Sequence, residues 1–376
     1  MRRLNYKKKI YIFSESRSEF FLLNQVYDAL KNDHNVKYII NGIKNLKKFE
    51  NNLKNLNLKK NNIKKYIKFK IEETDASSVA LNFTSLFNEL SLFFKKNKPD
   101  LLIVLGDRFQ TLCCSMVANL FSIRILHLHG GEITKGSNDD IYRHIITKLS
   151  NFHFTSTNQY KNRVKQLGEL PENILNIGSI GALNAKRSHS EFSKKKQIIK
   201  KKNIVVCVNS ETNNLHNSRK NLLEILRALK KIKNFEIHFT LASYDIDVNY
   251  INSKIKKFCS INKNAKYSYS LGQAKFFKEV ANSLILLGNS SSGIIEAPSL
   301  KTPTINVGNR QLGRIFGDSV FNCKSDSKLI LAKINEVLNL SKKNKINYFN
   351  PYLKKNCLKL IKKKISTIVK IKKIKK

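Results

Sequence analysis

The stretch PDLLIVLGD, Pro99–Asp107, places five consecutive apolar residues between a proline and a glycine. A short apolar run bounded by turn residues predicts a strand that is buried on both faces. A helical pattern follows from about Gln110 to Leu120, and a second apolar run, IRILHLHGG, begins at Ile123. This order of strand, helix and strand indicates parallel strands joined by crossover helices.

The same rhythm extends from this stretch in both directions. Toward the N-terminus, Ile10–Phe13 and Val36–Ile40 are predicted strands, with a helix from about Glu19 to Leu30 between them. Toward the C-terminus, a helix is expected near Asp139, and FHFTST and ILNIGSI are short strands. The pattern is typical of a doubly wound α/β domain, which we expect to occupy residues 1–184.

The second half of the chain repeats this organisation. The polar segment NAKRSHSEFSKKKQIIKKKN, from Asn184, is interpreted as a linker. Strands are then expected in IVVCVNS, FEIHFTLAS, KYSYSLG, SLILLGNSSSG and TPTINVGN, with a helix over NLLEILRALKKI. We therefore expect a second domain over residues 185–376, whose last helix, about 355–374, packs back on the body. Ligands of open α/β sheets bind at the carboxyl ends of the strands, so a cleft between the domains is the expected site.

The net charge of +43 invites a nucleic-acid interpretation. Only 12 of the 70 basic residues are arginine, and the lysines are scattered through asparagine-rich runs such as KKNNIKKYIK. Specific readers of nucleic acid usually concentrate arginine and aromatic residues on one element. We therefore expect no specific nucleic-acid partner, only weak polyanion binding at low salt.

Cysteine usage and hydropathy indicate the compartment. The six cysteines form no C-x-x-C pair and have no histidine at zinc-ligand spacing. No apolar run approaches the 18 residues that a membrane span needs. We expect a cytoplasmic protein with reduced thiols and no membrane span; a peripheral membrane contact through the lysine-rich tail stays open.

The stretch HLHGGEITKGSNDDIYRH, His127–His144, concentrates titratable side chains at a strand end. Its first two histidines alternate along the strand and so face opposite sides. We expect His127 in the core and His129, nearer the tip, in the chemistry, together with Glu132. In the helix expected next, the pair Asp139 and Arg143 and the pair Asp140 and His144 each share a face. Helix capping by Asn138 or Asp139 is the structural alternative.

Charged residues also follow two strands of the first domain. Asp107 and Arg108 come directly after the run of PDLLIVLGD, where a carboxylate either caps the next helix or faces the cleft as a base. Arg17, in the loop SESRSEF, reaches a phosphate or is simply exposed.

In the second half, LGNSSSGIIEAPS runs from a strand into a helix. Ser290, Ser291 and Ser292 offer hydroxyls and free N–H groups that suit a phosphate, and Glu296 suits ribose hydroxyls. A plain serine cap is the alternative. Arg310, in GNRQLGRIFGDS, adds positive charge to a diphosphate site or is solvated.

Five motifs carry a family resemblance. GDRF, HLHGGE, DDIYRHIITKLS, NSSSGIIEAPS and GNRQLGR, in this order and spacing, resemble the hydrolysing UDP-N-acetylglucosamine 2-epimerases, the branch used in sialic-acid and legionaminic-acid synthesis. The resemblance covers nearly the whole chain. It implies a GT-B-type fold, with two Rossmann-like domains and the active site between them, and a homodimer or homotetramer.

The resemblance also implies a reaction and its residues. A UDP-sugar loses UDP, and water is added to give the free 2-epimer, typically N-acetylmannosamine or a 2,4-diacetamido-trideoxy analogue, without a metal or nicotinamide cofactor. By similarity the acid/base group is Asp107, His129, Glu132, Asp139 and Asp140, with Arg143 orienting the carboxylates. The residues that hold the UDP-sugar are Arg17, Arg108, Asn209, Ser290, Ser291, Ser292, Glu296 and Arg310.

Two positions depart from the family pattern. The family usually has glycine where this chain has Glu15, and histidine where it has Asn209 in VCVNSETN. Asparagine donates a hydrogen bond but carries no proton or charge, and His216 is one candidate to replace the histidine. An altered sugar nucleotide, a slower enzyme and lost catalysis are all compatible with these departures.

Two other functions remain alternatives. A GT-B glycosyltransferase would share the fold and the diphosphate site but would pass the sugar to an acceptor. A sugar-nucleotide sensor would bind UDP without turnover. The carboxylates and histidines between His127 and His144 favour elimination over transfer, because elimination needs a base for a carbon-bound proton.

Overall fold

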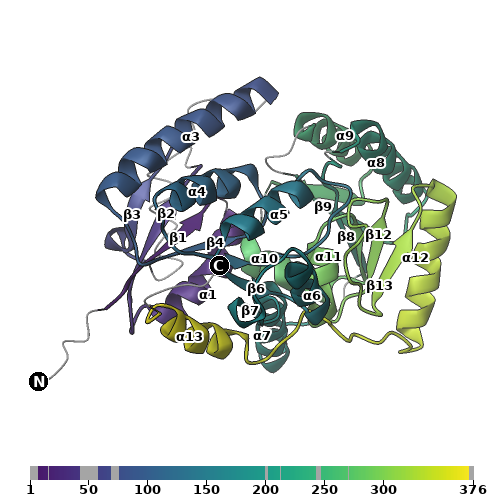
Figure 1. Cartoon of the computed structure of the whole chain (residues 1–376). Helices are drawn as coiled ribbons and strands as arrows, with labels where there is room; N and C mark the ends of the chain where they lie inside the picture. The colour runs from purple at the N-terminus through teal and green to yellow at the C-terminus, as the bar shows by residue number, and fades with distance from the viewer. Residues whose placement is uncertain are drawn as a thin grey trace, which may run out of the picture. The chain divides into compact units, whose positions relative to one another are not determined.

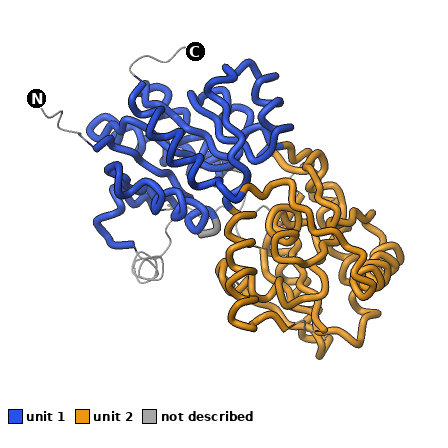
Figure 2. The backbone as a smooth tube through the Cα atoms, turned by 90° about the horizontal axis from the view of Figure 1, so that it is seen from below, with its two compact units in different colours: residues 1–132, 139–180, 355–376 blue, residues 133–138, 181–354 orange. Residues whose placement is uncertain are grey.

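The computed structural model describes residues 7–15, 17–42, 58–68, 76–199, 202–211, 213–242, 247–269 and 271–371. The chain divides into two compact units, coloured in Figure 2. The first comprises residues 1–132, 139–180 and 355–376, and the second residues 133–138 and 181–354. Within the described ranges, no helix is long and apolar enough to cross a membrane.

Unit 1 is built on a parallel sheet with the strand order β3-β2-β1-β4-β5-β6-β7 (Figure 1). The order of the strands reverses between β1 and β4, which places the carboxyl ends of these two neighbours at the switch point of the sheet. The strands are β1 Lys9–Ser14, β2 Asn35–Ile40, β3 Ile63–Tyr66, β4 Leu101–Leu105, β5 Ile125–Leu128, β6 Phe152–Thr155 and β7 Ile174–Asn176.

Helices cover both faces of this sheet (Figure 1). On one face α3, α4 and α5 lie side by side, and on the other α1 packs against the C-terminal helix α13. The stretch of β4 is buried at every position, as its apolar run predicts. The helices are α1 Arg17–Leu30, α3 Ala76–Lys96, α4 Phe109–Leu120, α5 Asp139–Leu149, α6 Asn158–Gln166 and α13 Cys357–Ile368, with short 3-10 turns η2 Lys60–Asn62 and η3 Pro171–Asn173.

Unit 2 has a second parallel sheet, in the order β10-β9-β8-β11-β12-β13. Along β8, Ile204 and Val206 face a core shared with α8, α9 and α12, while Val205 and Cys207 face the core under α10. The strands are β8 Asn203–Cys207, β9 Glu236–Thr240, β10 Ala265–Ser268, β11 Ile285–Gly288, β12 Thr304–Val307 and β13 Val320–Cys323. The helices are α7 Ile180–Lys194, α8 Leu215–Lys230, α9 Val248–Ile261, α10 Gly272–Asn282, α11 Ser292–Ile295 and α12 Ser327–Lys342, with the 3-10 turn η4 Ala297–Leu300.

Two predictions from the sequence need correction. The linker expected from residue 184 is wrong over much of its length, because Ile180–Lys194 forms α7. The first turns of this helix, residues 180–185, are buried, and the polar positions from 186 to 194 are half-buried or exposed. The edge strands β3 and β13 were missed as well. Both are only partly buried, so they lack the apolar run that marks an interior strand.

The C-terminal helix belongs to unit 1, although its sequence follows the second domain. Ile361, Ile365 and Ile368 of α13 are fully buried. Arg124 of unit 1 donates a hydrogen bond of 2.8 Å to the carbonyl of Ile371, and Lys362 pairs with Asp33 at 3.0 Å. The apolar stripe of α13 therefore packs this helix against unit 1, next to α1.

Candidate active site

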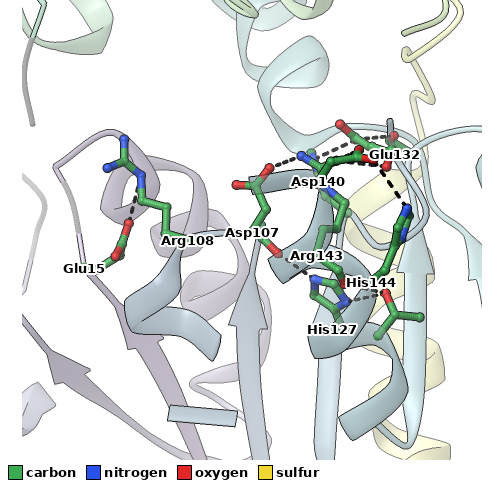
Figure 3. Close-up of polar contacts among 12 residues, drawn as sticks. Glu15, Asp107, Arg108, His127, Glu132, Asp140, Arg143 and His144 are labelled. Carbon is green, nitrogen blue, oxygen red and sulfur yellow. Dashed lines mark hydrogen bonds and ion pairs between the residues drawn. The ribbon is translucent and has the colours of Figure 1, made fainter. Parts of the chain in front are cut away.

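Arg143 is the centre of a charged cluster at the carboxyl ends of β4 and β5. Its side chain, on α5, is only 1% exposed. The guanidinium forms an ion pair with Asp107, lies 3.2 Å from Oδ1 of Asp140, and donates a 2.8 Å hydrogen bond to the carbonyl of Glu132 (Figure 3). The planar fork of arginine can hold all three oxygens at once. The cluster therefore fixes two carboxylates and the main chain of a third acidic residue.

His129 and Glu132 form a second pair beside this cluster. Nδ1 of His129 lies 3.3 Å from Oε1 of Glu132, and Ser156 donates a 2.6 Å hydrogen bond to the same oxygen. His129 adopts φ +67°, an uncommon left-handed conformation for a residue with a side chain. Its Nε2 is buried and meets no hydrogen-bond partner among the described residues. The pair thus leaves one imidazole nitrogen available for proton transfer.

His127 has the structural role that the sequence predicts for it. The side chain is fully buried, with Nε2 2.7 Å from the carbonyl of Gly106 and Nδ1 3.2 Å from the hydroxyl of Thr147. Burial lowers the pKa of His127 to about 3, so the ring is neutral at physiological pH. Both nitrogens are engaged, and the ring ties β5 to β4 and α5.

Arg108 points away from Asp107 and toward Glu15, the residue after β1 (Figure 3). Nε of Arg108 lies 3.0 Å from Oε1 of Glu15, whose side chain is only 2% exposed. Glu19, whose Oε2 accepts a hydrogen bond from the amide of Glu15 at 3.3 Å, has its pKa raised to about 7 by burial. A buried carboxylate thus neutralises Arg108 at the switch point of the sheet.

Three predicted residues of unit 1 lie at or near the starts of helices. Asp107 does not cap α4, since Arg108 occupies the cap position and Asp107 turns to Arg143. Asp139 begins α5 and is half-buried. Arg17 begins α1, and its side chain lies outside the described part of the structure. Their roles in the reaction stay predictions.

In unit 2, Asn209 and Asn289 join the ends of the neighbouring strands β8 and β11. The amide of Asn209 donates a 2.7 Å hydrogen bond to the side chain of Asn289, which returns a 2.8 Å bond to the carbonyl of Asn209. Arg310, after β12, donates to the carbonyls of Ser210 at 2.9 Å and Asn289 at 3.4 Å. Asn209 and Arg310 therefore meet at the switch point of the second sheet.

Glu211 supports this arrangement and was missed in the sequence. Its Oε1 accepts hydrogen bonds from the amides of Asn309 and Arg310 at 3.3 and 3.2 Å, and from the side chain of Asn221 at 2.5 Å. Burial raises the pKa of Glu211. Its signal in the sequence, an acidic residue just after an apolar strand, is the same one that points to Asp107.

The serine-rich turn lies next to Asn289. The amide of Ser292 donates a 3.3 Å hydrogen bond to the hydroxyl of Ser290, and Ser290, Ser291 and Ser292 are all partly exposed. Glu296 lies against α7, where a Cβ at Gly181 would be 2.2 Å from its Oε1. His216 is exposed in the first turn of α8, and its replacement of the family histidine stays a prediction.

Comparisons with known proteins agree with these motifs. The model of the UDP-N-acetylglucosamine 2-epimerase family matches residues 28–366. The polysialic acid biosynthesis protein P7 of Escherichia coli is 32% identical, over 93% of this chain and 92% of its own. A hydrolysing GDP/UDP-N,N'-diacetylbacillosamine 2-epimerase of Campylobacter jejuni is 33% identical, over 84% of each chain.

A solved structure has the same fold. A crystal structure of UDP-GlcNAc 2-epimerase from Neisseria meningitidis, bound to UDP-GlcNAc, superposes with a TM-score of 0.80 at 19% identity, covering 96% of this chain and 99% of that one. The family match includes parts of both units and all five motifs that carry the resemblance. The chain belongs to the UDP-N-acetylglucosamine 2-epimerase family.

Proposed function

We propose that the protein is a hydrolysing 2-epimerase that acts on a UDP-linked 2-acetamido sugar. The observation that carries the proposal is the cluster in which buried Arg143 holds Asp107, Asp140 and the carbonyl of Glu132. A glycosyl transfer breaks the bond from C1 to the diphosphate and removes a proton from the acceptor oxygen, but it breaks no carbon–hydrogen bond. Epimerisation at C2 also requires a base for a carbon-bound proton and an acid to return one.

The reaction we propose has two steps. In the first, a carboxylate takes the proton from C2, the electron pair forms a C1–C2 double bond, and UDP leaves with the electrons of its bond to C1. In the second, a proton returns to C2 from the opposite face, water adds its oxygen to C1, and the released proton goes to a base. Two acid/base groups on opposite faces of the sugar are therefore needed.

The side chains of unit 1 supply candidates for both groups. Asp107 and Asp140, held by Arg143, form one group, with Asp139 at the start of the same helix. His129, oriented through Nδ1 by Glu132, forms the other and exchanges its proton at Nε2. Orientation of one ring nitrogen by a carboxylate fixes the nitrogen that faces the substrate, as in other histidine bases.

The UDP group is assigned to the switch point of the second sheet. Arg310 and the hydroxyls of Ser290, Ser291 and Ser292 would bind the diphosphate, and Glu296 would accept hydrogen bonds from the ribose. Asn209 would donate a neutral hydrogen bond where the family usually has histidine. Arg17 and Arg108 complete the proposed set.

The names of the relatives suggest which sugar the enzyme uses, and we propose two candidates from them. Relatives from Campylobacter jejuni and Legionella pneumophila are named N,N'-diacetylbacillosamine 2-epimerases, and the one from Escherichia coli a polysialic acid biosynthesis protein. The candidates are thus UDP-N-acetylglucosamine and a UDP-2,4-diacetamido-trideoxy sugar. We further propose that the enzyme works in the cytoplasm as a homodimer or homotetramer.

Proton NMR in heavy water tests the proposal. The protein is incubated with UDP-N-acetylglucosamine and, in parallel, with the UDP- and GDP-linked diacetamido sugars. We expect free nucleoside diphosphate and a free 2-epimer carrying deuterium at C2, from one of these substrates. Nucleotide release without deuterium at C2 would exclude elimination. UDP binding without release from any substrate would favour a sensor.

A further inference from the structure

Residues 133–138 occupy an unusual place in the chain. They belong to unit 2, whereas Glu132 before them and Asp139 after them belong to unit 1. We call residues 133–138 the strap. Within the strap, the amide of Ser137 donates a 3.0 Å hydrogen bond to the carbonyl of Thr134, and both side chains are buried. The strap is therefore a compact turn inserted between two residues of the acid/base group.

The strap packs against the segment of Arg310, residues 309–313. The amide of Lys135 donates a 3.0 Å hydrogen bond to the carbonyl of Leu312, and the side chain of Asn213 donates one of 2.8 Å to the carbonyl of Lys135. At Gly136 a Cβ would lie 2.5 Å from Cα of Arg310. The backbone of the strap is thus in direct contact with the backbone of residues 309–313, so a shift of one segment would displace the other.

Gly313 completes the contact from the other side. It adopts φ +93°, and a Cβ there would lie 2.5 Å from Cγ2 of Ile133. Glycine is the residue that takes this conformation at no steric cost and leaves room for the isoleucine. Ile133, the first residue of the strap, therefore packs against residues 309–313, as Gly136 in the middle of the strap does.

Both ends of this connection carry side chains of the proposed reaction. Glu132, next to the strap, orients His129 and gives its carbonyl to Arg143; Asp140, two residues beyond the strap, also pairs with Arg143. Arg310 is held by the carbonyl of Ser210 and, through its amide, by Glu211. Only six residues of chain separate Glu132 from Asp139, so a displacement of the strap reaches both.

We propose that the strap couples nucleotide binding at Arg310 to the position of the acid/base group, with Asn213 and Gly136 as its positioning residues. The inference rests on the proposed function, which assigns UDP to Arg310. Bound UDP fixes the segment 309–313, and the strap then holds Glu132 and Asp139 in place. Because UDP stays bound after its bond to C1 breaks, the proton acceptor and donor remain set for the second step.

Asn213→Ala tests the coupling without altering a residue of the proposed substrate or acid/base sets. We expect kcat to fall about tenfold, because small misplacements of catalytic groups reduce rates strongly, while Kd for UDP stays within about twofold of the wild type. Gly136→Ala should reduce kcat further. The matched control is Asn264→Ala, which removes hydrogen bonds of 3.0 and 2.9 Å to the carbonyls of Ile232 and Phe235, away from the strap. It should leave kcat unchanged.

Amide hydrogen exchange with UDP alone gives a readout that does not depend on turnover. In the wild type, UDP should slow exchange in residues 133–138 and in α5. In Asn213→Ala, bound UDP should still protect residues 309–313 but protect α5 much less. Wild-type UDP protection that omits α5 would overturn the coupling, as would equal kcat in Asn213→Ala and Asn264→Ala.

The same measurements separate this inference from the proposed function. UDP-dependent protection of α5 in a protein that forms no free 2-epimer would support the coupling and reject the reaction. Formation of the 2-epimer without UDP-dependent protection of α5 would support the reaction and reject the coupling. A protein that does not bind UDP would reject both.

Discussion

Asp107 and Arg143 form an ion pair although they lie 36 positions apart in the chain. Asp107 follows β4 and Arg143 lies on α5, so the pair exists only because the parallel sheet brings the carboxyl ends of β4 and β5 to one edge. Arg143 is almost completely buried, whereas Asp107 and Asp140 are each 24% exposed. The cation is therefore the fixed element, and the carboxylates are the groups that reach solvent.

Replacing Arg143 with alanine should damage both stability and catalysis. Removing one partner of a buried ion pair leaves charge uncompensated, and we expect a loss of about 3 kcal/mol in the free energy of unfolding. The freed carboxylates should lower kcat by about 100-fold. Urea unfolding and the NMR assay measure the two effects.

Arg227→Ala is the control for this variant, because Arg227 pairs with Glu224 on the surface and is 67% exposed. Its removal should change the unfolding free energy by less than about 1 kcal/mol and leave kcat as it is. Equal losses in the two variants would contradict a special role for the cluster around Arg143.

His127 and His129 should separate stability from chemistry. His129→Asn removes the available Nε2 and should lower kcat by a factor of about 100 or more, typical of a lost acid/base group, with a small effect on unfolding. His127→Asn should destabilise the fold instead, because its ring joins Gly106 and Thr147. If His127→Asn lowered kcat under conditions in which the variant is fully folded, His127 and not only His129 would have a role in the chemistry.

The pKa of His127 adds a prediction about pH. The ordinary histidine pKa is 6.5, and burial lowers the pKa of His127 in the folded protein to about 3. Between these two pH values the unfolded chain is protonated at this residue while the folded protein is not, so acidification favours unfolding. Stability contributed by neutral His127 is complete above pH 6.5 and should decrease by about 2 kcal/mol on acidification to pH 5. Unfolding curves at several pH values should show the stability gap between wild type and His127→Asn narrowing as pH falls.

The pair of Glu15 and Arg108 should weaken the binding of an anionic substrate. Glu15→Gln removes the charge that neutralises Arg108, and we expect Kd for UDP to fall about fivefold at low salt, with the gain lost at high salt. Isothermal titration measures the change. In a double-mutant cycle, Arg108→Gln should matter more in the Glu15→Gln background than in the wild type. Additive effects would show that Arg108 does not contact UDP.

Gly181→Ala should act on the nucleotide through Glu296. The new Cβ would lie 2.2 Å from Oε1 of Glu296, so the carboxylate must move, while alanine is a good helix former in the first turn of α7, where Gly181 stands. We expect Kd for UDP to rise about tenfold with no loss of stability. Discrimination between UDP and 2'-deoxy-UDP should decrease. At Gly272 a Cβ meets no atom within 4 Å, but φ is +67°, so Gly272→Ala strains the backbone there without displacing a side chain and should leave UDP binding unchanged. A similar loss of binding in this variant would contradict the role of Glu296.

The interior of both sheets could be predicted from the sequence. Runs such as Leu101–Leu105 and Ile285–Gly288 are buried at every position, and such strands need continuous apolar residues whatever surrounds them. The neutral core role of His127 was also predictable, because alternation along a strand puts it opposite His129. The edge strands β3 and β13 and the helix α7 were not, since partly exposed elements carry few apolar residues and their signal resembles that of loops.

The sequence by itself determined which residue types stand at the strand ends, and with them the family. The resemblance to the family, carried by motifs in the sequence, placed Asp107, His129, Glu132 and Arg143 in one candidate group. Only the tertiary structure decided the partners: Arg108 with Glu15, Asp107 with Arg143, Glu211 with the amides of Asn309 and Arg310, and the strap with the segment of Arg310. Such pairs join residues far apart in the chain, and their choice depends on strand order and on burial, which removes water as a competing partner.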